Sequence, residues 1–288
     1  MNLKNQTKKV LITGGCGFIG GCLIRRLLKS TDWIIYNLDK ISYASYQMDT
    51  KKIKHLNRYY LLEVDLSNFQ NTQFALEDSD PDFVIHLAAE THVDRSIDNS
   101  MPFIKSNILG TYNLLECCKK HWENLNAIRK KEFRFLHVST DEVFGSLGEK
   151  GSFSEKSPYD PRSPYSASKA ASDHLVNAWF HTFDMPTIRT NCSNNFGPYQ
   201  FPEKLIPLVI LKAINNLQIP VYGNGENIRD WLYVEDHIDA LLTVLQKGEI
   251  GNNYCIGGNN EKSNIEIAQL ICDILDEFIP TNTKHREF

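Results

Sequence analysis

The chain has 288 residues, of which 42% are hydrophobic and 23% are charged, and its formal net charge is −4. This length suffices for one large domain or two small ones. Acidic and basic residues are mixed, so no basic stripe indicates nucleic-acid binding, and no apolar run reaches the ~18 residues of a membrane span. The seven cysteines are odd in number and lack Cys-x-x-Cys spacing, which favours reduced thiols and a cytoplasmic location.

The first predicted element is a glycine-rich turn between a strand and a helix. Residues 9–13 predict a buried parallel strand, and the apolar spacing of residues 18–28 predicts a helix. Between them, Gly14, Gly17 and Gly20 allow a tight turn, a close approach of a pyrophosphate and packing of the helix on the strand. Three glycines alone often mark only a turn, but here they have the flanking elements of a dinucleotide site.

The next strand ends in an acidic residue that suits an adenosine ribose. Residues 33–38 form an apolar run that ends at Asp39, close to the expected ~20 residues beyond the glycines. A carboxylate there accepts hydrogen bonds from ribose hydroxyls and repels a 2′-phosphate, so we predict NAD rather than NADP. The neighbouring Lys40 weakens this preference.

Two further strands are predicted before the middle of the chain. Residues 59–64 end in a polar exit at residues 65–66, which suits the adenine edge of the cofactor. Residues 83–87 are followed by Ala88 and Ala89, whose small size suits a chain pressed against a flat cofactor. We expect His86, inside this apolar run, to be a hydrogen-bonded core histidine.

The segment after this strand is predicted to be a loop. It contains His92, Asp94 and Arg95, whose spacing matches no common metal site. We therefore predict a structural role for these residues and no metal in the protein.

Long helices and a polar-ended strand follow. Residues 101–122 predict one helix with apolar positions on more than one face, which indicates deep burial or an oligomer interface. Residues 133–139 predict a strand that leads into Thr140-Asp141-Glu142. Residues 149–162 read as a surface excursion, and residues 165–183 as a helix that precedes a strand at residues 186–190.

The character of the chain changes after residue 190. We expect a polar loop from residue 191 to residue 199, and then helices at 203–216, 235–247 and 264–278 and strands at 228–234 and 253–256. The alternation predicts an α/β fold with a Rossmann-type, doubly wound parallel sheet in residues 1–190. Residues 191–288 are predicted to form a smaller mixed lobe, some elements of which return to the sheet. Ligands should bind at the carboxyl ends of the strands.

Tyr165 and Lys169 are spaced to lie on one face of a helix. A tyrosine of pKa ~10 is ionised in about one molecule in a thousand at pH 7, and lowering this pKa by ~3 units takes ~4 kcal/mol. Lys169 and the positive nicotinamide ring can supply that energy, so that the phenolate accepts a proton from an alcohol. The Tyr-x-x-x-Lys pattern is common by chance, but after the dinucleotide fingerprint it indicates a dehydrogenase step.

The combined motifs resemble the extended short-chain dehydrogenase/reductases and, among them, the nucleotide-sugar 4,6-dehydratases. The resemblance covers essentially the whole chain, and the Thr140-Asp141-Glu142 triplet is its most specific part. The motifs that carry it are Thr13-Gly14-Gly15-x-Gly17-Phe18-Ile19-Gly20, residues 86–96, residues 139–145, residues 191–207 and residues 229–236.

The resemblance implies an NAD-dependent lyase that converts dTDP-glucose or UDP-glucose into a 4-keto-6-deoxy sugar. Tyr165 takes the proton of the sugar 4-hydroxyl as hydride passes from C4 to NAD, and Thr140 holds the 4-oxygen. Glu142 then removes the C5 proton, protonated Asp141 gives its proton to the departing 6-hydroxyl, and hydride returns to C6. Two neighbouring carboxyls in a closed site can hold opposite protonation states.

The resemblance also implies the ligand-binding residues. The expected NAD-binding set is Gly14, Gly17, Phe18, Ile19, Gly20, Asp39, Asp65, Leu66, Leu87, Ala88, Ala89, Ser106, Tyr165, Lys169 and Asn195. The expected nucleotide-sugar set is Thr91, Thr140, Asn194, Lys204, Leu205, Pro220, Tyr222, Arg229 and Asn264. Most of these residues lie in the lobe of residues 191–288, so the nucleotide sugar is expected largely there. Arg229 is the expected diphosphate clamp, and its plainer role is a surface ion pair with Asp230 or Glu235.

Several alternatives stay open from the residues. A nucleotide-sugar 4-epimerase or decarboxylase would need Tyr165 and NAD but not the two carboxyls. A non-catalytic NAD-sensing regulator would need neither the oxidation nor the elimination. The choice between a thymine and a uracil base is also open. We expect a homodimer through helices 101–122 and 165–183. Relatives usually continue beyond the point that corresponds to Phe288, so the sequence suggests a shortened C-terminus.

Overall fold

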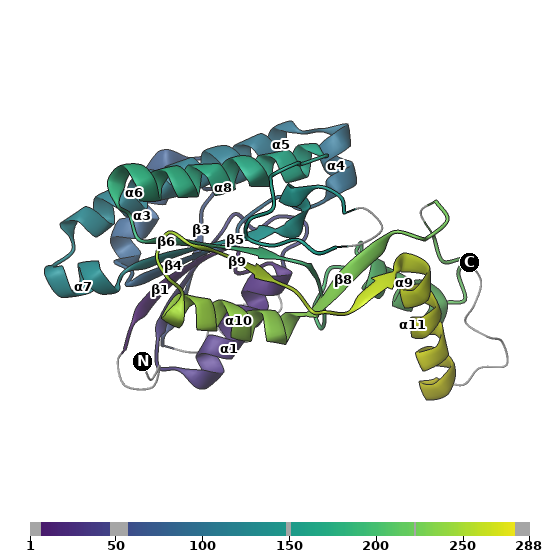
Figure 1. The fold of residues 1–288 in the computed structure, drawn as a ribbon. Helices are drawn as coiled ribbons and strands as arrows, with labels where there is room; N and C mark the ends of the chain where they lie inside the picture. Colours follow the sequence, from purple (N-terminus) through teal and green to yellow (C-terminus); the bar gives the residue numbers. More distant parts are fainter. Residues whose placement is uncertain (1–6, 47–56, 148–150, 222, 280–288) are drawn as a thin grey trace. The chain divides into compact units, whose positions relative to one another are not determined.

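The computed structural model describes residues 7–46, 57–147, 151–221 and 223–279 (Figure 1). The chain forms two compact units. The first comprises Met1–Cys192 and Ile238–Ile256, and the second comprises Ser193–His237 and Gly257–Phe288. Within the described ranges, no helix combines the length and the apolar character needed to cross a bilayer.

The first unit is built on a parallel sheet of seven strands in the order β3-β2-β1-β4-β5-β6-β9. The strands are β1 (Lys9–Thr13), β2 (Ile34–Asp39), β3 (Tyr59–Glu63), β4 (Phe83–His86), β5 (Arg134–Thr140), β6 (Thr187–Cys192) and β9 (Asn253–Ile256). The strand order reverses between β1 and β4, which confirms the predicted doubly wound fold. Because the strands are parallel, their last residues lie along the same side of the sheet, at its carboxyl ends. These residues include Thr13, His86 and Thr140.

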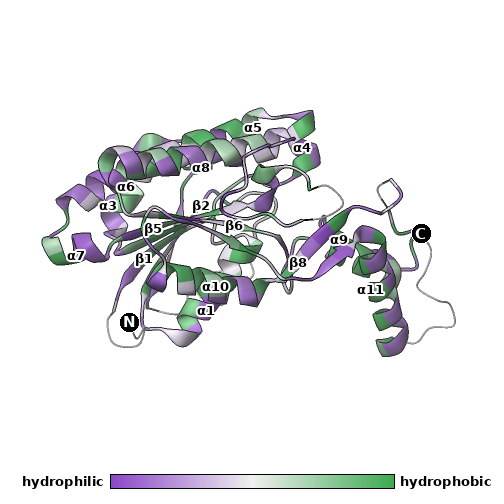
Figure 2. Cartoon of the chain, viewed as in Figure 1, coloured by the Kyte–Doolittle hydropathy of each residue, from purple (hydrophilic) through white to green (hydrophobic). Residues whose placement is uncertain are grey.

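Helices cover both faces of this sheet. On one face lie α3 (Phe69–Ser79), α6 (Gly110–Asn124) and α8 (Pro164–Phe183), and on the other α1 (Phe18–Ser30) and residues 238–247 of α10 (Val234–Lys247) (Figure 1). An ion pair between Arg26 and Asp239 joins α1 to α10. Figure 2 shows the apolar strands of the central sheet, among which Val10, Leu11 and Ile12 are fully buried. Buried apolar area of this kind is the main source of folding free energy.

The predicted helix 101–122 is interrupted. It consists of α5 (Met101–Phe103), a π-helical segment η1 (Ile104–Leu109) and α6. The wider turn accompanies the buried Asn107, whose amide donates to the Glu90 carbonyl at 3.0 Å and to Ser168 Oγ at 2.8 Å, while its oxygen accepts from Glu90 N at 2.8 Å. Such segments often occur at functional sites, and this one ties the end of β4 to α8.

Two predicted loops contain regular structure. The segment with His92 forms the short helix α4 (Val93–Asp98), because the His92 ring accepts from Arg95 N at 3.4 Å and caps the helix. The polar segment from residue 191 continues β6 to Cys192 and then forms β7 (Asn194–Phe196). Three further elements were not predicted from the sequence: α3, α7 (Ala127–Glu132) and the short strand β10 (Glu261–Ser263).

The second unit contains the mixed sheet β10-β8-β7. Its centre, β8 (Ile228–Tyr233), runs parallel to β7 and antiparallel to β10. Helices α9 (Leu205–Ile214) and α11 (Asn264–Phe278) pack together through a small apolar core that includes Val209 and Cys272. A capping box between Ser263 and Glu266 starts α11.

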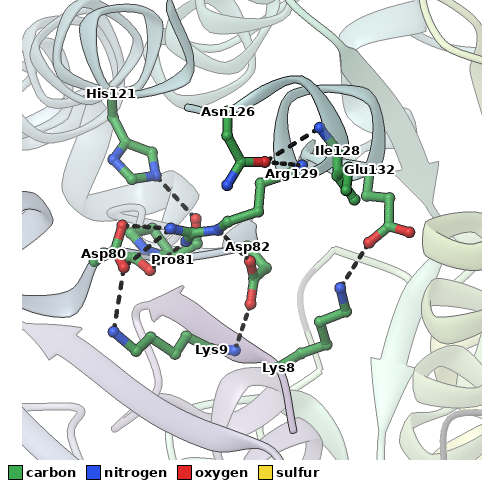
Figure 3. A network of polar contacts seen from close by, with 10 residues as sticks. All are labelled: Lys8, Lys9, Asp80, Pro81, Asp82, His121, Asn126, Ile128, Arg129 and Glu132. Carbon is green, nitrogen blue, oxygen red and sulfur yellow. Dashed lines mark hydrogen bonds and ion pairs between the residues drawn. The ribbon is translucent and has the colours of Figure 1, made fainter. Parts of the chain in front are cut away.

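A polar network lies at the amino-terminal end of β1, opposite the glycine turn (Figure 3). Arg129 of α7 contacts both carboxylate oxygens of Asp80 at 2.9 and 3.0 Å, the Asp80 carbonyl at 2.8 Å and Asp82 at 2.8 Å. Lys9 of β1 contacts the same Asp80 at 3.2 Å. Asp80 is the left-handed C-cap of α3, so the network joins α3, α7 and β1.

His86 is a satisfied core histidine, as predicted. Its ring nitrogens lie 2.7 Å from Thr13 Oγ1 and 2.9 Å from Thr111 Oγ1, and the side chain is buried. Burial lowers the pKa of His86 well below 6.5 and lowers the pKa of His137 and of His237 to about 4.

These buried histidines should make the protein acid-sensitive. The unfolded chain binds protons at pKa 6.5, whereas His137 and His237 in the folded protein do so only at about 4. The contribution of each histidine to the free energy of unfolding is therefore fully present above pH 6.5. It falls by about 1.4 kcal/mol per pH unit for each histidine as the pH drops toward 4. Urea unfolding at pH 7, 6 and 5 measures this slope, and His137→Gln should make it shallower. An unchanged urea midpoint between pH 7 and pH 5 would contradict the assignment.

Candidate active site

The glycine turn has the geometry of a phosphate-binding turn. Gly14 has φ +74°, and a Cβ atom there would lie 2.7 Å from the backbone of Ala88. A Cβ atom on Gly20 would lie 2.4 Å from the Gly14 carbonyl oxygen, because α1 packs directly on the turn. Gly17 is the N-cap of α1 and provides no side-chain cap, so the first N–H groups of α1 can bind an anion.

Gly14→Ala should destabilise the protein by about 3 kcal/mol, because a left-handed φ and a clash with Ala88 act together. Gly21→Ala is the matched control, since its Cβ atom would meet only the Arg25 guanidinium at 3.4 Å and the Gly15 carbonyl at 3.6 Å. That control should be neutral or more stable by up to about 1 kcal/mol. Urea unfolding compares the two variants, and equal midpoints would exclude the close packing described for Gly14.

Asp39 lies beside the glycine turn. Its carboxylate accepts from Cys16 N at 2.9 Å and from Ile41 N at 2.8 Å, and burial raises its pKa. The Lys40 ammonium contacts Glu90 Oε1 at 2.5 Å and Ser106 Oγ at 3.3 Å, and its charge partly opposes the effect of burial on the pKa of Asp39. The preference of this site for an unphosphorylated ribose, which Lys40 weakens, stays a prediction.

The remaining residues of the predicted cofactor set in the first unit lie near the strand ends. Phe18 and Ile19 begin α1. Leu87 N donates to the Thr13 carbonyl and Ala88 N to Thr13 Oγ1, both at 3.2 Å. The other members are Asp65 (exposed), Leu66 (buried, with its carbonyl bonded to Asn113), Ala89 (half-buried) and Ser106 (half-buried, bonded to Lys40).

The predicted catalytic side chains meet between the end of β5 and the start of α8. Thr140 ends β5, and its hydroxyl donates to Asp141 Oδ1 and accepts from Glu142 N, both at 3.3 Å. Asp141 and Glu142 begin the 3₁₀ turn η2 (Asp141–Phe144). Tyr165 is buried, and its environment includes Thr140 as a hydrogen-bond partner and the charges of Glu142 and Asp141. The structure therefore brings the hydroxyl, the phenol and both carboxyls together.

The pKa of Tyr165 responds to burial and to neighbouring charges. Burial raises it well above 10, the charge of Glu142 raises it further, and the hydrogen bond with Thr140 only partly opposes them. Lys169 lies on the same helix face, but its ammonium donates to the Val138 carbonyl at 3.0 Å. The sequence predicts that Lys169 and the positive nicotinamide ring lower this pKa together, and in the structure burial and the charge of Glu142 are what that pair must overcome.

Burial also acts on Lys169. Only 4% of this residue is exposed, and burial lowers the pKa of its ammonium. The neighbouring charge of Asp173 opposes this lowering. Asp173 was not among the residues predicted from the sequence. Its spacing of four residues from Lys169 is the signal that could have revealed it.

In the second unit, the predicted residues Asn194 and Asn195 lie in β7 beside β8. The Asn195 side chain donates to the Ser193 carbonyl at 3.0 Å and contacts His237 Nδ1 at 2.8 Å. These contacts fix the orientation of the amide.

Arg229 lies in β8 and is exposed. It stands opposite Lys262 of β10, and like charges in this position repel each other unless an anion binds. The Asp230 carboxylate accepts from Gly258 N at 2.6 Å and Asn260 N at 2.8 Å, and the plainer role of Arg229 stays a prediction. Asn264 begins α11 next to this sheet, and its N–H donates to the Asn227 carbonyl at 3.1 Å.

The other predicted substrate residues are spread over both units. Lys204 is the N-cap of α9, and Leu205 begins that helix and packs on its apolar core. Pro220 is exposed, as is Thr91 of the first unit. Tyr222 and the predicted shortened end at residues 280–288 lie outside the described residues.

The sheet, the glycine turn and the Tyr165–Lys169 pair define an extended short-chain dehydrogenase/reductase. The family model described as GDP-mannose 4,6 dehydratase matches residues 11–286. A dTDP-glucose 4,6-dehydratase of Salmonella typhimurium is 50% identical, over 97% of this chain and 80% of that protein. The chain belongs to this family of nucleotide-sugar dehydratases, as a relative of the dTDP-glucose 4,6-dehydratases.

Solved structures agree with this membership. The dTDP-glucose 4,6-dehydratase of Bacillus anthracis in complex with NAD has a TM-score of 0.85 and 38% identity, and the match covers 98% of this chain and 87% of that one. DesIV of Streptomyces venezuelae, a dTDP-glucose 4,6-dehydratase solved as a double mutant with NAD and a second ligand, has a TM-score of 0.86 and 36% identity. That match covers 93% of this chain and 81% of the other.

Proposed function

We propose that the protein is an NAD-dependent lyase that converts dTDP-glucose into its 4-keto-6-deoxy derivative and water. The observation that carries this proposal is the grouping of Asp141 and Glu142 with Thr140 and Tyr165. Tyr165 and Lys169 alone would serve any sugar oxidation on this scaffold, whereas an elimination of water needs both an acid and a base. The relatives are named for the same activity, which supports the proposal.

The residues of the first unit suit NAD as the resident cofactor. Gly14, Gly17 and Gly20 leave room for a pyrophosphate at the start of α1, and Asp39 suits the ribose hydroxyls. Bound there, NAD would supply a reversible hydride acceptor for the sugar carbons and the positive charge of its nicotinamide ring. That charge is the one that the raised pKa of Tyr165 requires.

The side chains divide the proton transfers between them. Tyr165 accepts the proton of the 4-hydroxyl, and Thr140 holds the 4-oxygen, which becomes a ketone. The ketone acidifies the C5–H bond, so Glu142 can remove this proton as a general base. Asp141 gives its proton to the 6-hydroxyl, which leaves as water while the C5–C6 double bond forms. Reduction of this double bond at C6 requires a proton at C5, which protonated Glu142 returns.

The nucleotide is assigned to the second unit. Arg229 and the facing Lys262 concentrate positive charge on adjoining strands, which suits a diphosphate. Asn194, Lys204, Leu205, Pro220, Tyr222 and Asn264, with Thr91 of the first unit, complete the proposed set. We assign NAD largely to residues 1–190 and the nucleotide sugar largely to residues 191–288, with β9 returning to the parallel sheet.

Incubation with dTDP-glucose and with UDP-glucose tests the function. A 4-keto-6-deoxy product is detected by its alkali-induced absorbance. The thymine methyl group contributes ~1 kcal/mol of burial, so we expect a preference for dTDP-glucose of about fivefold in kcat/KM. Recovery of a sugar that keeps its 6-hydroxyl and is inverted at C4 would instead indicate an epimerase.

We further propose a cytoplasmic homodimer. The seven cysteines all lie in the described residues, and none of them forms a disulfide there. Met101, Ile104, Leu109 and Tyr112 leave more than 40% of their surface exposed along α5, η1 and α6. Tyr112 meets Trp179 of α8 edge to face at 5.9 Å, so these residues border α8 and could form one interface. Sedimentation equilibrium at micromolar concentration should give twice the chain mass, and a monomer would exclude the dimer.

A further inference from the structure

Asp173 is a buried acid that the proposed chemistry does not use. It lies on α8 one turn beyond Lys169 and two turns beyond Tyr165, so the three residues follow one face of the helix. Its side chain is fully buried. Buried carboxylates are rare unless hydrogen bonds and a counter-charge compensate for the lost hydration.

The carboxylate of Asp173 is surrounded by donors. Asp173 Oδ2 accepts from Tyr159 Oη at 3.0 Å and from Asn191 Nδ2 at 3.1 Å, and Oδ1 lies 3.0 Å from His137 Nε2. Because burial lowers the pKa of His137 to about 4, the ring is neutral at pH 7 and donates its Nε2–H. The hydrogen bond from His137 and the charge of Lys169 outweigh burial and lower the pKa of Asp173, so it is ionised.

Lys169 stands one helical turn from this acid on α8, and the charge of each residue acts on the pKa of the other. Its ammonium is buried and has one hydrogen-bond acceptor, the Val138 carbonyl, among the described residues. Burial disfavours the charged ammonium, and the charge of Asp173 is the largest influence that favours it, followed by Cys192 of β6. The charge of Lys169 in turn acts on His137 of β5 and His86 of β4, which are both neutral.

The same carboxylate is connected to the end of β5. Asn191 Nδ2 donates both to Asp173 Oδ2 and, at 2.9 Å, to the carbonyl of Thr140. Thr140 immediately precedes Asp141 and Glu142, so the carboxylate orients the amide that holds this strand end.

We propose that Asp173 is a positioning residue, the buried counter-charge that keeps Lys169 protonated and, through Asn191, holds the strand end that carries Thr140. Its kinetic consequence rests on the proposed function and on the prediction from the sequence that a cationic Lys169 assists Tyr165. The charge pairing itself is independent of any substrate.

The pH dependence of turnover tests the kinetic consequence. In Asp173→Asn, Lys169 loses its proton at lower pH, so the alkaline limb of kcat/KM should move down by one pH unit or more. The matched control is Tyr159→Phe, which removes one hydrogen bond to the same carboxylate but keeps its charge, and the limb should stay in place. Equal profiles for both variants would overturn the proposal.

A stability cycle tests the pairing without substrate. Asp173→Asn should lower the urea midpoint by leaving an unpaired buried ammonium, and adding Lys169→Met should recover most of that loss. If Asp173→Asn alone does not fold, the double variant should fold. Additive losses, or failure of both variants to fold, would overturn the proposal. A recovered midpoint in a protein that turns over no sugar nucleotide would instead contradict only the proposed function.

Discussion

Glu142→Gln should lower turnover of dTDP-glucose by about 10²–10⁴-fold, because the amide cannot accept the C5 proton. Oxidation at C4 should remain measurable as nicotinamide absorbance, since Tyr165 and Lys169 are intact. Solvent deuterium should no longer enter C5 of the sugar. Glu142 lies in the short turn η2, whose backbone is held by Thr140, so the isosteric change should leave the neighbouring residues in place.

Asp141→Asn is the matched variant at the neighbouring position. It should block loss of the 6-hydroxyl but still allow deuterium to enter C5, because the base is present and the acid is missing. The two variants therefore separate the two halves of the elimination. Full turnover by Glu142→Gln would show that the dehydratase mechanism is wrong.

Tyr165→Phe should abolish C4 oxidation, with a loss of about 10²–10⁴-fold in kcat. Deuterium exchange at C5 should disappear as well, because no 4-ketone forms to acidify that position. The ring of Tyr165 packs edge to face against Phe103 at 6.4 Å, a contact that phenylalanine keeps, so stability should change little.

Tyr159→Phe provides the control for the loss of a buried tyrosine hydroxyl. Tyr159 bonds Asp173 and is not assigned to the substrate, so C4 oxidation should persist in this variant. Nicotinamide absorbance after mixing with dTDP-glucose distinguishes the two. Undiminished C4 oxidation by Tyr165→Phe would remove Tyr165 from its proposed role.

The parallel sheet and the glycine turn could be predicted because they depend on local patterns. Buried parallel strands appear in the sequence as short apolar runs. The order of strand, glycine turn and helix is typical of dinucleotide-binding sites. Helices α3 and α7 were missed because they are short, largely polar and held by contacts such as Arg129 with Asp80. These contacts join residues far apart in sequence.

Tertiary contacts also explain why parts of the site were not foreseen. The π-helical segment η1 accompanies the contacts of Asn107 with Glu90 and Ser168, which no local pattern reveals. The raised pKa of Tyr165 follows from burial next to Glu142 rather than from its spacing to Lys169. The sequence around Asp173 predicts an ordinary polar helix position. Its burial follows only from the packing of α8 on β5 and β6.

The fate of the hydrogen at C4 tests the central claim most directly. The protein is incubated with dTDP-glucose that carries deuterium at C4, and the product is analysed by NMR. We predict that the deuterium is found at C6 of the 4-keto-6-deoxy sugar, with a solvent-derived hydrogen at C5. Deuterium retained at C4, or lost to solvent while the product forms, would contradict the proposed sequence of oxidation, elimination and reduction.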